Sequence, residues 1–419
     1  MGFASAWLEE RAIFPEIIKE APDKLTGIIV VIPAFDEPGI RQVLDSLALC
    51  TEPECKVEVI VVVNAPADAA EECIYNNKLT IKNIESWKKE NRNCFFRLFA
   101  FTAESSVKGW GVGLARKAGM DEAVRRFSSI DNPEGVIVNL DADCLVEKNY
   151  FVSHYNDLLI RKGRTACSIY FEHPVSGNDF PESVYKSITL YELHLRYYFQ
   201  GLAYSGFPYV FHTVGSAVAV KALQYIKAGG MNRRQAGEDF YFIQKLVPAG
   251  GYFSLNSTTV YPSPRASFRV PFGTGASIGK LTSEPGSSLL TYNFNAFKEL
   301  RTFFAGTEKY YDCSIEELSG YYKFLPEGLR LFSEEKDWKD KMREISINTS
   351  GLSSFKKRFF GWFNMFRIVK YLNYVHQDYF KKSDVEVSAC ELLDAIGINA
   401  GSKDPGELLS LYRTLEKNH

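Results

Sequence analysis

The chain has 419 residues, of which 46% are hydrophobic and 24% are charged, with a formal charge of −2. These values are typical of a globular protein with room for two or three domains, and the lack of excess basic charge argues against a nucleic-acid partner. Eight cysteines without a CxxC pair fit a reducing compartment. We recognise no signal peptide and no apolar run of about 20 residues that could span a membrane, so we expect a cytoplasmic protein.

Four apolar runs rich in β-branched residues predict strands that are buried on both faces of a sheet. They are residues 27–33, 56–66, 94–102 and 135–143. Helical spacing follows the first run from residue 40, and a glycine-led loop enters a helix within 108–127. Strands that alternate with helices predict an α/β fold with a mostly parallel sheet flanked by helices. Ligands of such sheets bind beyond the carboxyl ends of the strands.

The middle of the chain has a mixed pattern. Residues 164–174 and 211–220 read as strands on either side of an aromatic helix at 183–199. Residues 229–253 predict a glycine loop, a helix and a further loop. After about residue 275 the chain turns polar and helical without a strong strand signal. We therefore expect a domain boundary at that point and a mainly helical C-terminal region at 276–419.

The fourth predicted strand runs into the sequence NLDAD, in which one residue separates Asp141 from Asp143. Side chains two residues apart lie on the same side of an extended strand, so both carboxylates can reach one divalent cation. Their hard oxygen atoms suit Mg²⁺ or Mn²⁺, which also bind substrate phosphates. The alternative is a solvated turn in which Asp143 caps the next helix. The position of the two aspartates at the edge of the sheet where ligands bind favours a metal site.

Five motifs occur in the order VVIPAFDEP, VEVIVVVNAP, ARKAGMDEAV, VNLDADC and GGMNRRQAGEDFYFIQKL. Together they resemble the family-2 nucleotide-sugar glycosyltransferases over roughly residues 27–270. The resemblance implies a GT-A-like (Rossmann-like) catalytic domain at 1–275 that uses Mg²⁺ or Mn²⁺. It also implies transfer of a sugar from a UDP- or GDP-linked donor to the hydroxyl of a saccharide, small-molecule or lipid-linked acceptor.

The resemblance further implies roles for single residues. Asp143 would ligate the metal that bridges the diphosphate, and Asp141 would contact the ribose or the metal-bound water. Glu238 and Asp239 match the acidic pair of the family, and Asp239 would deprotonate the acceptor. The remaining nucleotide- and donor-binding residues would be Pro33, Ala34, Phe35, Glu37, Asn64, Lys108 and Arg116.

Separate carboxylates for the metal and for the proton agree with a one-step inverting displacement. The metal and cationic side chains stabilise the charge of the leaving diphosphate, and a carboxylate near the acceptor removes its proton. Inversion is therefore the prediction, and a retaining GT-A-type transferase is the alternative. Glu238 and Asp239 could also be acids at a helix N-terminus, where the helix dipole favours them.

The sequence departs from the family pattern after this acidic pair. Many metal-dependent relatives place a histidine there, but no histidine lies between His212 and His376. Arg265 and Arg269 occupy the segment instead, and their planar donor forks could bind the diphosphate. A solvated loop is an equal alternative.

Two other functions are alternatives to glycosyl transfer. A nucleotidyltransferase should carry a glycine-rich basic loop after the first strand, and IPAFDEP is neither glycine-rich nor basic. A non-catalytic sugar-nucleotide-binding protein remains open, although the acidic residues are intact.

Residues 354–382 form an aromatic stripe at helical spacing with lysines and arginines beside it. Such a helix can lie on an anionic membrane, which would be a peripheral contact near a lipid-linked acceptor. More often an aromatic stripe packs on its own domain.

Overall fold

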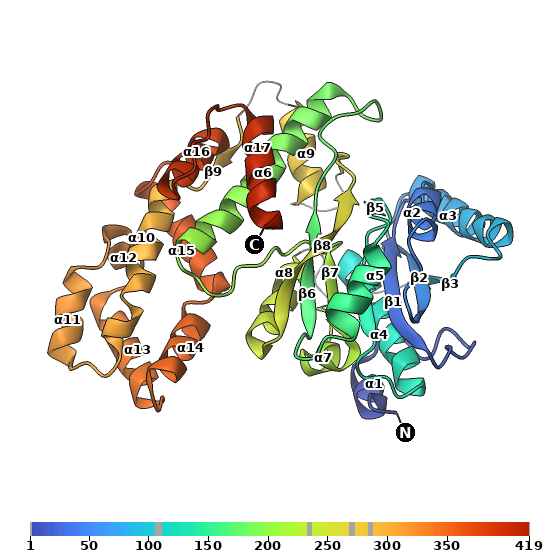
Figure 1. Ribbon diagram of the computed structural model, residues 1–419, viewed down its shortest axis with the longest axis horizontal. Coiled ribbons are helices and arrows are strands. Elements are labelled where there is room, and N and C mark those ends of the chain that lie inside the picture. Colours follow the sequence, from blue (N-terminus) through green and yellow to red (C-terminus); the bar gives the residue numbers. More distant parts are fainter. Residues whose placement is uncertain (1, 105–110, 233–236, 268–272, 284–287, 419) are drawn as a thin grey trace. The chain divides into compact units, whose positions relative to one another are not determined.

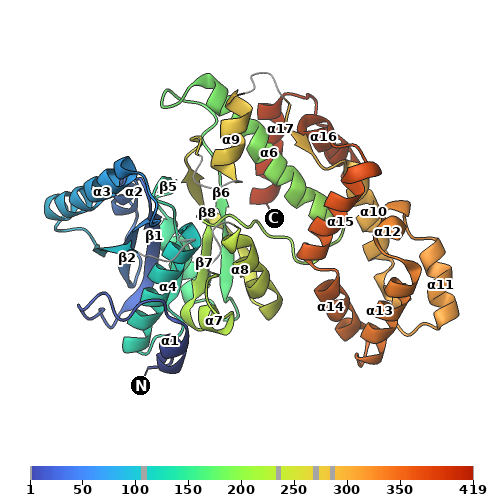
Figure 2. The same ribbon diagram turned by 180° about the vertical axis from the view of Figure 1, so that it is seen from behind.

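The computed structural model describes residues 2–104, 111–232, 237–267, 273–283 and 288–418. The chain divides into two compact units (Figure 1, and from behind Figure 2). Unit 1 consists of Met1–Phe180 and Phe211–Gly279, and unit 2 consists of Pro181–Val210 and Lys280–His419. The aromatic helix expected at 183–199 therefore belongs to unit 2, together with the C-terminal region.

Unit 1 is built on an eight-stranded sheet with the strand order β3-β2-β1-β4-β7-β6-β8-β5. The strands are β1 Thr26–Ala34, β2 Lys56–Ala65, β3 Phe96–Glu104, β4 Val136–Asn139, β5 Cys144–Val146, β6 Ala166–Phe171, β7 Val218–Lys221 and β8 Tyr252–Pro262. Strands β3, β2, β1 and β4 are parallel to one another, and β6 is parallel to β8. Only β7 and β5 run antiparallel to their neighbours. The predicted α/β fold with a mostly parallel sheet is confirmed.

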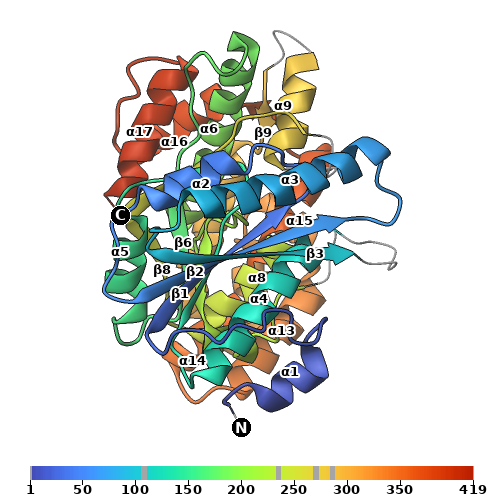
Figure 3. The same cartoon turned by 90° about the vertical axis from the view of Figure 1, so that its right-hand side faces the viewer.

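The central strands form because their apolar side chains are covered on both faces. All nine residues of β1 are buried, and so are nine of the ten residues of β2. Figure 3 shows α2 and α3 on one face of this part of the sheet and α1 and α4 on the other. The helices of unit 1 are α1 Ser5–Arg11, α2 Arg41–Ala48, α3 Glu71–Glu90, α4 Val112–Ser129, α5 Tyr150–His154, α7 Ala222–Lys227 and α8 Glu238–Leu246, and α9 Thr274–Ser283 runs across the boundary between the units.

Strand β8 is a feature that the sequence pattern did not predict. Only part of its side chains are buried, and polar residues such as Ser254, Asn256 and Ser257 interrupt the apolar ones. The strand is held by its pairing with β6 and β5, whose residues lie about a hundred positions earlier in the chain. Tertiary pairing has therefore overridden a weak local signal.

Unit 2 is mainly helical, as expected for the C-terminal region. Its helices are α6 Glu182–Tyr204, α10 Phe294–Ala305, α11 Ile315–Lys323, α12 Glu327–Phe332, α13 Glu335–Ile347, α14 Leu352–Trp362, α15 Met365–Asp378, α16 Val385–Ala395 and α17 Pro405–Lys417, with a short strand pair of β9 Leu290–Thr291 and β10 Ser383–Asp384. The aromatic stripe of α14 packs inside the unit, with the rings of Phe359 and Phe303 5.4 Å apart. Phe355 and Phe359 are both fully buried there.

A buried ionic network joins α6 to α17 within unit 2. Glu192 accepts hydrogen bonds from Arg196 on its own helix, at 2.8 Å, and from Arg413 on α17, at 2.8 and 2.9 Å. Arg196 also pairs with Glu416. Both Glu192 and Arg196 are fully buried, so their charges depend on each other for stabilisation. In the part of the chain that the structure describes, no helix combines the length and the apolar character that crossing a membrane requires.

Candidate active site at the carboxyl edge of the sheet

The candidate site lies where β1 and β4 end side by side. These strands are parallel, and Val31 on β1 lies opposite Asn139, the last residue of β4. The next strand after β1 in the chain, β2, pairs on the other side of β1. The order of strands thus reverses between β1 and β4, which is the point where ligands bind in open α/β sheets. Glu37 follows β1, and Asp141 and Asp143 follow β4.

A first ion-paired group joins the ends of β1, β4 and β8. Arg265, in the segment after β8, donates from Nε to Oδ2 of Asp143 at 2.8 Å and from Nη2 to Oε1 of Glu37. The Glu37 side chain is 9% exposed, whereas those of Asp143 and Arg265 are 27% and 30% exposed. Burial alone would lower the pKa of Arg265, but the carboxylates of Asp143 and Glu37 raise it. The guanidinium therefore remains charged.

A second ion-paired group is centred on Arg116 of α4. Its Nη2 lies 2.6 Å from Oδ1 of Asp141, and its Nη1 donates to Oε1 of Glu238. The side chains of Arg116 and Glu238 are nearly inaccessible, while that of Asp141 is 35% exposed. Burial opposes the charge of Arg116, but Asp141 and Glu238 raise its pKa above the ordinary value. One guanidinium thus connects the end of β4 with the start of α8.

Helix α8 presents the acidic pair predicted from the sequence. It begins at Glu238, and the preceding Gly237 has a φ of 71°, a left-handed conformation that favours glycine. Asp239 Oδ1 accepts a hydrogen bond of 2.7 Å from the N–H of Phe240, and the backbone N–H of Gly215 also donates to this carboxylate. Burial raises the pKa of both Glu238 and Asp239, and Arg116 opposes that rise.

The loop after β1 is held by polar residues of α3 that the motifs did not point to. Asp36 adopts a φ of 58°, its N–H donates to Asn77 Oδ1 at 3.0 Å, and its Oδ1 accepts from Asn76 at 2.6 Å. Asn77 also donates to the carbonyl of Asn64 at 2.8 Å, and Thr80 donates to the carbonyl of Glu37 at 2.9 Å. Helix α3 was not predicted from the sequence, and Asn77 and Thr80 recur with Ile84 and Trp87 at helical spacing, which was the signal that could have found them.

The structure places the other predicted site residues at the same edge of the sheet. Pro33 and Ala34 end β1 and are buried, Phe35 is partly exposed, and Asn64, near the end of β2, is 3% exposed. Lys108 and Arg269 lie outside the described residues. Glu37, Asp143 and Arg265 therefore form one group, and Arg116, Asp141, Glu238 and Asp239 form a second.

The chemistry of these donors allows a hard divalent cation, but a complete shell of protein ligands is not formed. No group of three or more histidine, cysteine, aspartate or glutamate residues that could hold a metal occurs among the residues with described positions. Asp141 and Asp143 each contact an arginine. Two carboxylates suffice for Mg²⁺ or Mn²⁺ only if water and substrate phosphates fill the other positions, which is the usual mode for Mg²⁺.

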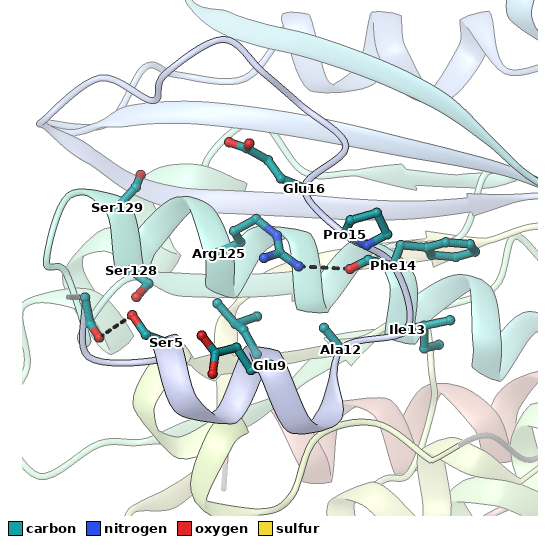
Figure 4. A pocket seen from close by; sticks show the side chains of 12 residues that line it. Ser5, Glu9, Ala12, Ile13, Phe14, Pro15, Glu16, Arg125, Ser128 and Ser129 are labelled. Carbon is teal, nitrogen blue, oxygen red and sulfur yellow. Dashed lines mark hydrogen bonds between the residues drawn. The ribbon is translucent and has the colours of Figure 1, made fainter.

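A cavity of about 600 Å³ lies elsewhere in unit 1, between α1 and the end of α4 (Figure 4). It is lined by residues such as Leu8, Phe14 and Ser128. Arg125 in its wall donates to the carbonyl of Phe14 at 2.9 Å. The cavity lies at the C-terminal end of α4, whereas Arg116 lies near the N-terminal end of that helix. It therefore contains none of the predicted site residues.

Comparison with known proteins gives matches among solved structures alone. No protein-family model matches the chain, and no curated protein matches it. The similar solved structures include complexes with nucleotide-sugars.

One is residues 1–349 of TarS from S. aureus with UDP-GlcNAc, at 14% identity, a TM-score of 0.38, and coverage of 93% of this chain and 90% of the other. Another is mannosyltransferase PcManGT from Pyrobaculum calidifontis with GDP-Man and Mn²⁺, at 14% identity, a TM-score of 0.34, and coverage of 90% and 93%. A third is glucosyl-3-phosphoglycerate synthase from Mycobacterium tuberculosis with Mn²⁺, UDP-Glc and phosphoglyceric acid, at 14% identity, a TM-score of 0.33, and coverage of 64% and 84%. TM-scores below 0.5 say nothing about the activity of this chain.

Proposed function

We propose that the chain is a GT-A-type glycosyltransferase that moves a sugar from a UDP- or GDP-linked donor to an acceptor hydroxyl, with inversion at the anomeric carbon. One observation carries the proposal. Two ion-paired groups occupy the topological switch point of the sheet, and Arg265 and Arg116 each pair with one of the two aspartates that follow β4. Sugar transfer from a nucleotide-sugar needs one end of the site to bind the diphosphate of the donor and another end to bind the acceptor.

The diphosphate end consists of Asp143, Asp141 and Arg265 in this proposal. Asp143 and Asp141 would hold Mg²⁺ or Mn²⁺, which supplies positive charge to stabilise the leaving nucleoside diphosphate. Arg265 is at the same place and is partly exposed. Its guanidinium can exchange a carboxylate for a phosphate oxygen, because both accept the same planar pair of donors.

Asp239 is the proposed general base. The residue is partly exposed, and burial of its carboxylate raises its pKa toward the working pH, as proton transfer requires. The backbone N–H groups of Gly215 and Phe240 orient it. Glu238 is nearly inaccessible and pairs with Arg116, so it is a poor candidate for the base. A carboxylate that abstracts a proton on the acceptor side favours inversion over retention.

The setting of the reaction is part of the same proposal. All eight cysteines are free thiols, which suits a reducing cytoplasm. The acceptor would be a saccharide, a small molecule or a lipid-linked molecule. Peripheral contact with a membrane through 354–382 would involve the exposed lysines and arginines of α14 and α15, such as Lys357, Arg358 and Lys370, because the rings of Phe355 and Phe359 are buried.

Calorimetric titration tests the function directly. UDP, GDP, UDP-glucose, UDP-N-acetylglucosamine and GDP-mannose are titrated into the full chain with and without Mn²⁺. We expect one nucleotide class to bind, and to bind more tightly with Mn²⁺. If none of these nucleotides binds, the proposed function is wrong. Nucleotide binding that does not respond to Mn²⁺ or Mg²⁺ would contradict the proposed metal dependence but not the proposed donor.

A further inference from the structure

The sequence predicts Arg116 near the nucleotide, but its side chain is buried and connects two carboxylates of the protein. The side chain is 5% exposed, and its two terminal nitrogens contact Asp141 and Glu238. These partners lie 25 and 122 residues away in the chain. Nε has no hydrogen-bond partner among the residues that the structure describes. A phosphate-binding arginine would instead present its fork to solvent.

The backbone at Gly215 packs directly against this guanidinium. A Cβ at Gly215 would lie 2.7 Å from Cζ and 2.8 Å from Nη2 of Arg116, closer than real Cβ contacts, so a side chain there would force the guanidinium to shift. The N–H of the same glycine donates to Asp239. Gly215 therefore fixes Arg116 on one side and the proposed base on the other.

The charges of this group do not balance. Arg116 is surrounded by the carboxylates of Asp141, Glu238 and Asp239, each of which raises its pKa. One positive charge cannot neutralise three negative charges. If one carboxylate loses its charge or binds a cation, the guanidinium interacts more strongly with the others.

We infer that Arg116 is a positioning residue that couples the diphosphate end of the site to helix α8. Through it Glu238, which is buried away from any substrate, controls the affinity for the donor. This inference rests on the proposed function. In the wild type the Arg116 guanidinium is shared between Glu238 and Asp141. Its interaction with Asp141 is therefore weaker, and the Asp141 carboxylate is available to bind at the diphosphate end.

The test measures donor binding in Glu238→Gln, which keeps the shape of the side chain and removes its charge. Arg116 then pairs with Asp141 alone, so we expect Mn²⁺-dependent affinity for the donor that the wild type binds to fall about fivefold or more. Glu52→Gln, at an exposed site, is the matched control and should bind as the wild type does. Unchanged affinity in Glu238→Gln overturns the inference.

The route through Arg116 is tested by combining variants. In an Arg116→Met background, Glu238→Gln should have no further effect on donor affinity, because the bridge is gone. An undiminished effect in that background overturns the inference. If Arg116→Met does not fold, as judged by circular dichroism, Gly215→Ala takes its place, since the added methyl group displaces the guanidinium without changing any charge.

A second measurement needs no substrate, so it tests the role of Arg116 independently of the proposed function. The equilibrium constant for unfolding is compared for Asp141→Asn, Glu238→Gln and the double variant. Among the described residues, the double variant leaves Asp239 as the remaining carboxylate that raises the pKa of this guanidinium. Its unfolding constant should therefore exceed the product of the two single effects by about tenfold or more. Additive effects rule out the bridge. A wild type that binds no nucleotide would overturn the proposed function but leave this result standing.

Discussion

At the scale of single residues, the site depends on how two arginines are shared among the carboxylates. Arg265 connects Glu37 with Asp143, and Arg116 connects Asp141 with Glu238. The two aspartates of the DxD sequence therefore belong to different groups although one residue separates them. Their substitutions should have different consequences.

The two proposed roles of the carboxylates can be separated by kinetics. Asp143→Ala should weaken Mn²⁺-dependent donor binding by about tenfold or more, because it removes the metal ligand and a partner of Arg265. Asp239→Asn should leave donor binding within about twofold and lower kcat by roughly 10²–10⁴-fold, because it removes the base. Calorimetry and release of nucleoside diphosphate measure the two effects. Normal turnover in Asp239→Asn would show that the base lies elsewhere.

At the scale of elements, α3 determines the conformation of the loop after β1. Asn77 is 8% exposed and bonds to the backbone of both Asp36 and Asn64. Its amide therefore ties the end of β1 to the end of β2. The loop carries Glu37, so its conformation sets the position of one partner of Arg265.

Asn77→Ala should lower the free energy of unfolding by about 2–4 kcal/mol, because it leaves one backbone N–H and one backbone carbonyl without this partner. Asn83→Ala on the same helix is the control. Asn83 makes an exposed hydrogen bond of 2.9 Å to the carbonyl of Pro38, and its loss should be below about 1 kcal/mol. Urea denaturation measures both variants. Equal losses would mean that Asn77 does not hold the loop.

The ionic network between α6 and α17 gives a second prediction at this scale. Glu192→Gln should lower the free energy of unfolding by about 3–5 kcal/mol, because the fully buried Arg196 and the partly buried Arg413 lose a shared counter-charge. Glu182→Gln, whose salt bridge at the start of α6 is exposed, should leave the free energy of unfolding close to that of the wild type. Denaturation of the two variants side by side provides the comparison, and equal losses would mean that the network contributes little.

The elements differ in how far the sequence could predict them. Strands β1, β2 and β4 were predictable because complete burial selects unbroken β-branched runs. Strand β8 was not, because it is half-buried and relies on distant partners. Glu37, Asp141 and Asp143 follow strand ends, and Glu238 and Asp239 begin a helix after a glycine, so these acidic residues could be recognised by position. Their arginine partners depend on tertiary packing, and Arg265 lies 228 residues from Glu37.

At the scale of the whole molecule, each unit contains a histidine whose pKa burial lowers, so that it stays neutral. Burial lowers the pKa of His154 on α5 to about 4, and burial with the nearby charge of Lys382 lowers that of His194 on α6 to about 4. The unfolded chain binds these protons below the ordinary pKa near 6.5, whereas the folded chain does not. Both units should therefore lose stability as the medium becomes acidic.

We expect the free energy of unfolding to fall between about pH 6.5 and pH 4, by up to about 1.4 kcal/mol per pH unit for each histidine. His154→Gln and His194→Gln should each flatten the profile in that range. Thermal unfolding followed from pH 7 to pH 4 provides the measurement. A profile that both variants leave unchanged would mean that carboxylates alone account for the acid sensitivity.

The division of unit 2 into two separate stretches of chain constrains the order of events during synthesis. Helix α6 leaves the ribosome early, but Arg413 and Glu416, which neutralise its buried charges, are made more than two hundred residues later. Until then Glu192 and Arg196 lack the counter-charges that α17 supplies. Domains generally fold as they are synthesised, from the N-terminal end. Here unit 1 receives all its strands before unit 2 can close around α6, so the nascent chain must carry an incomplete helical unit while the strands of unit 1 are already all present.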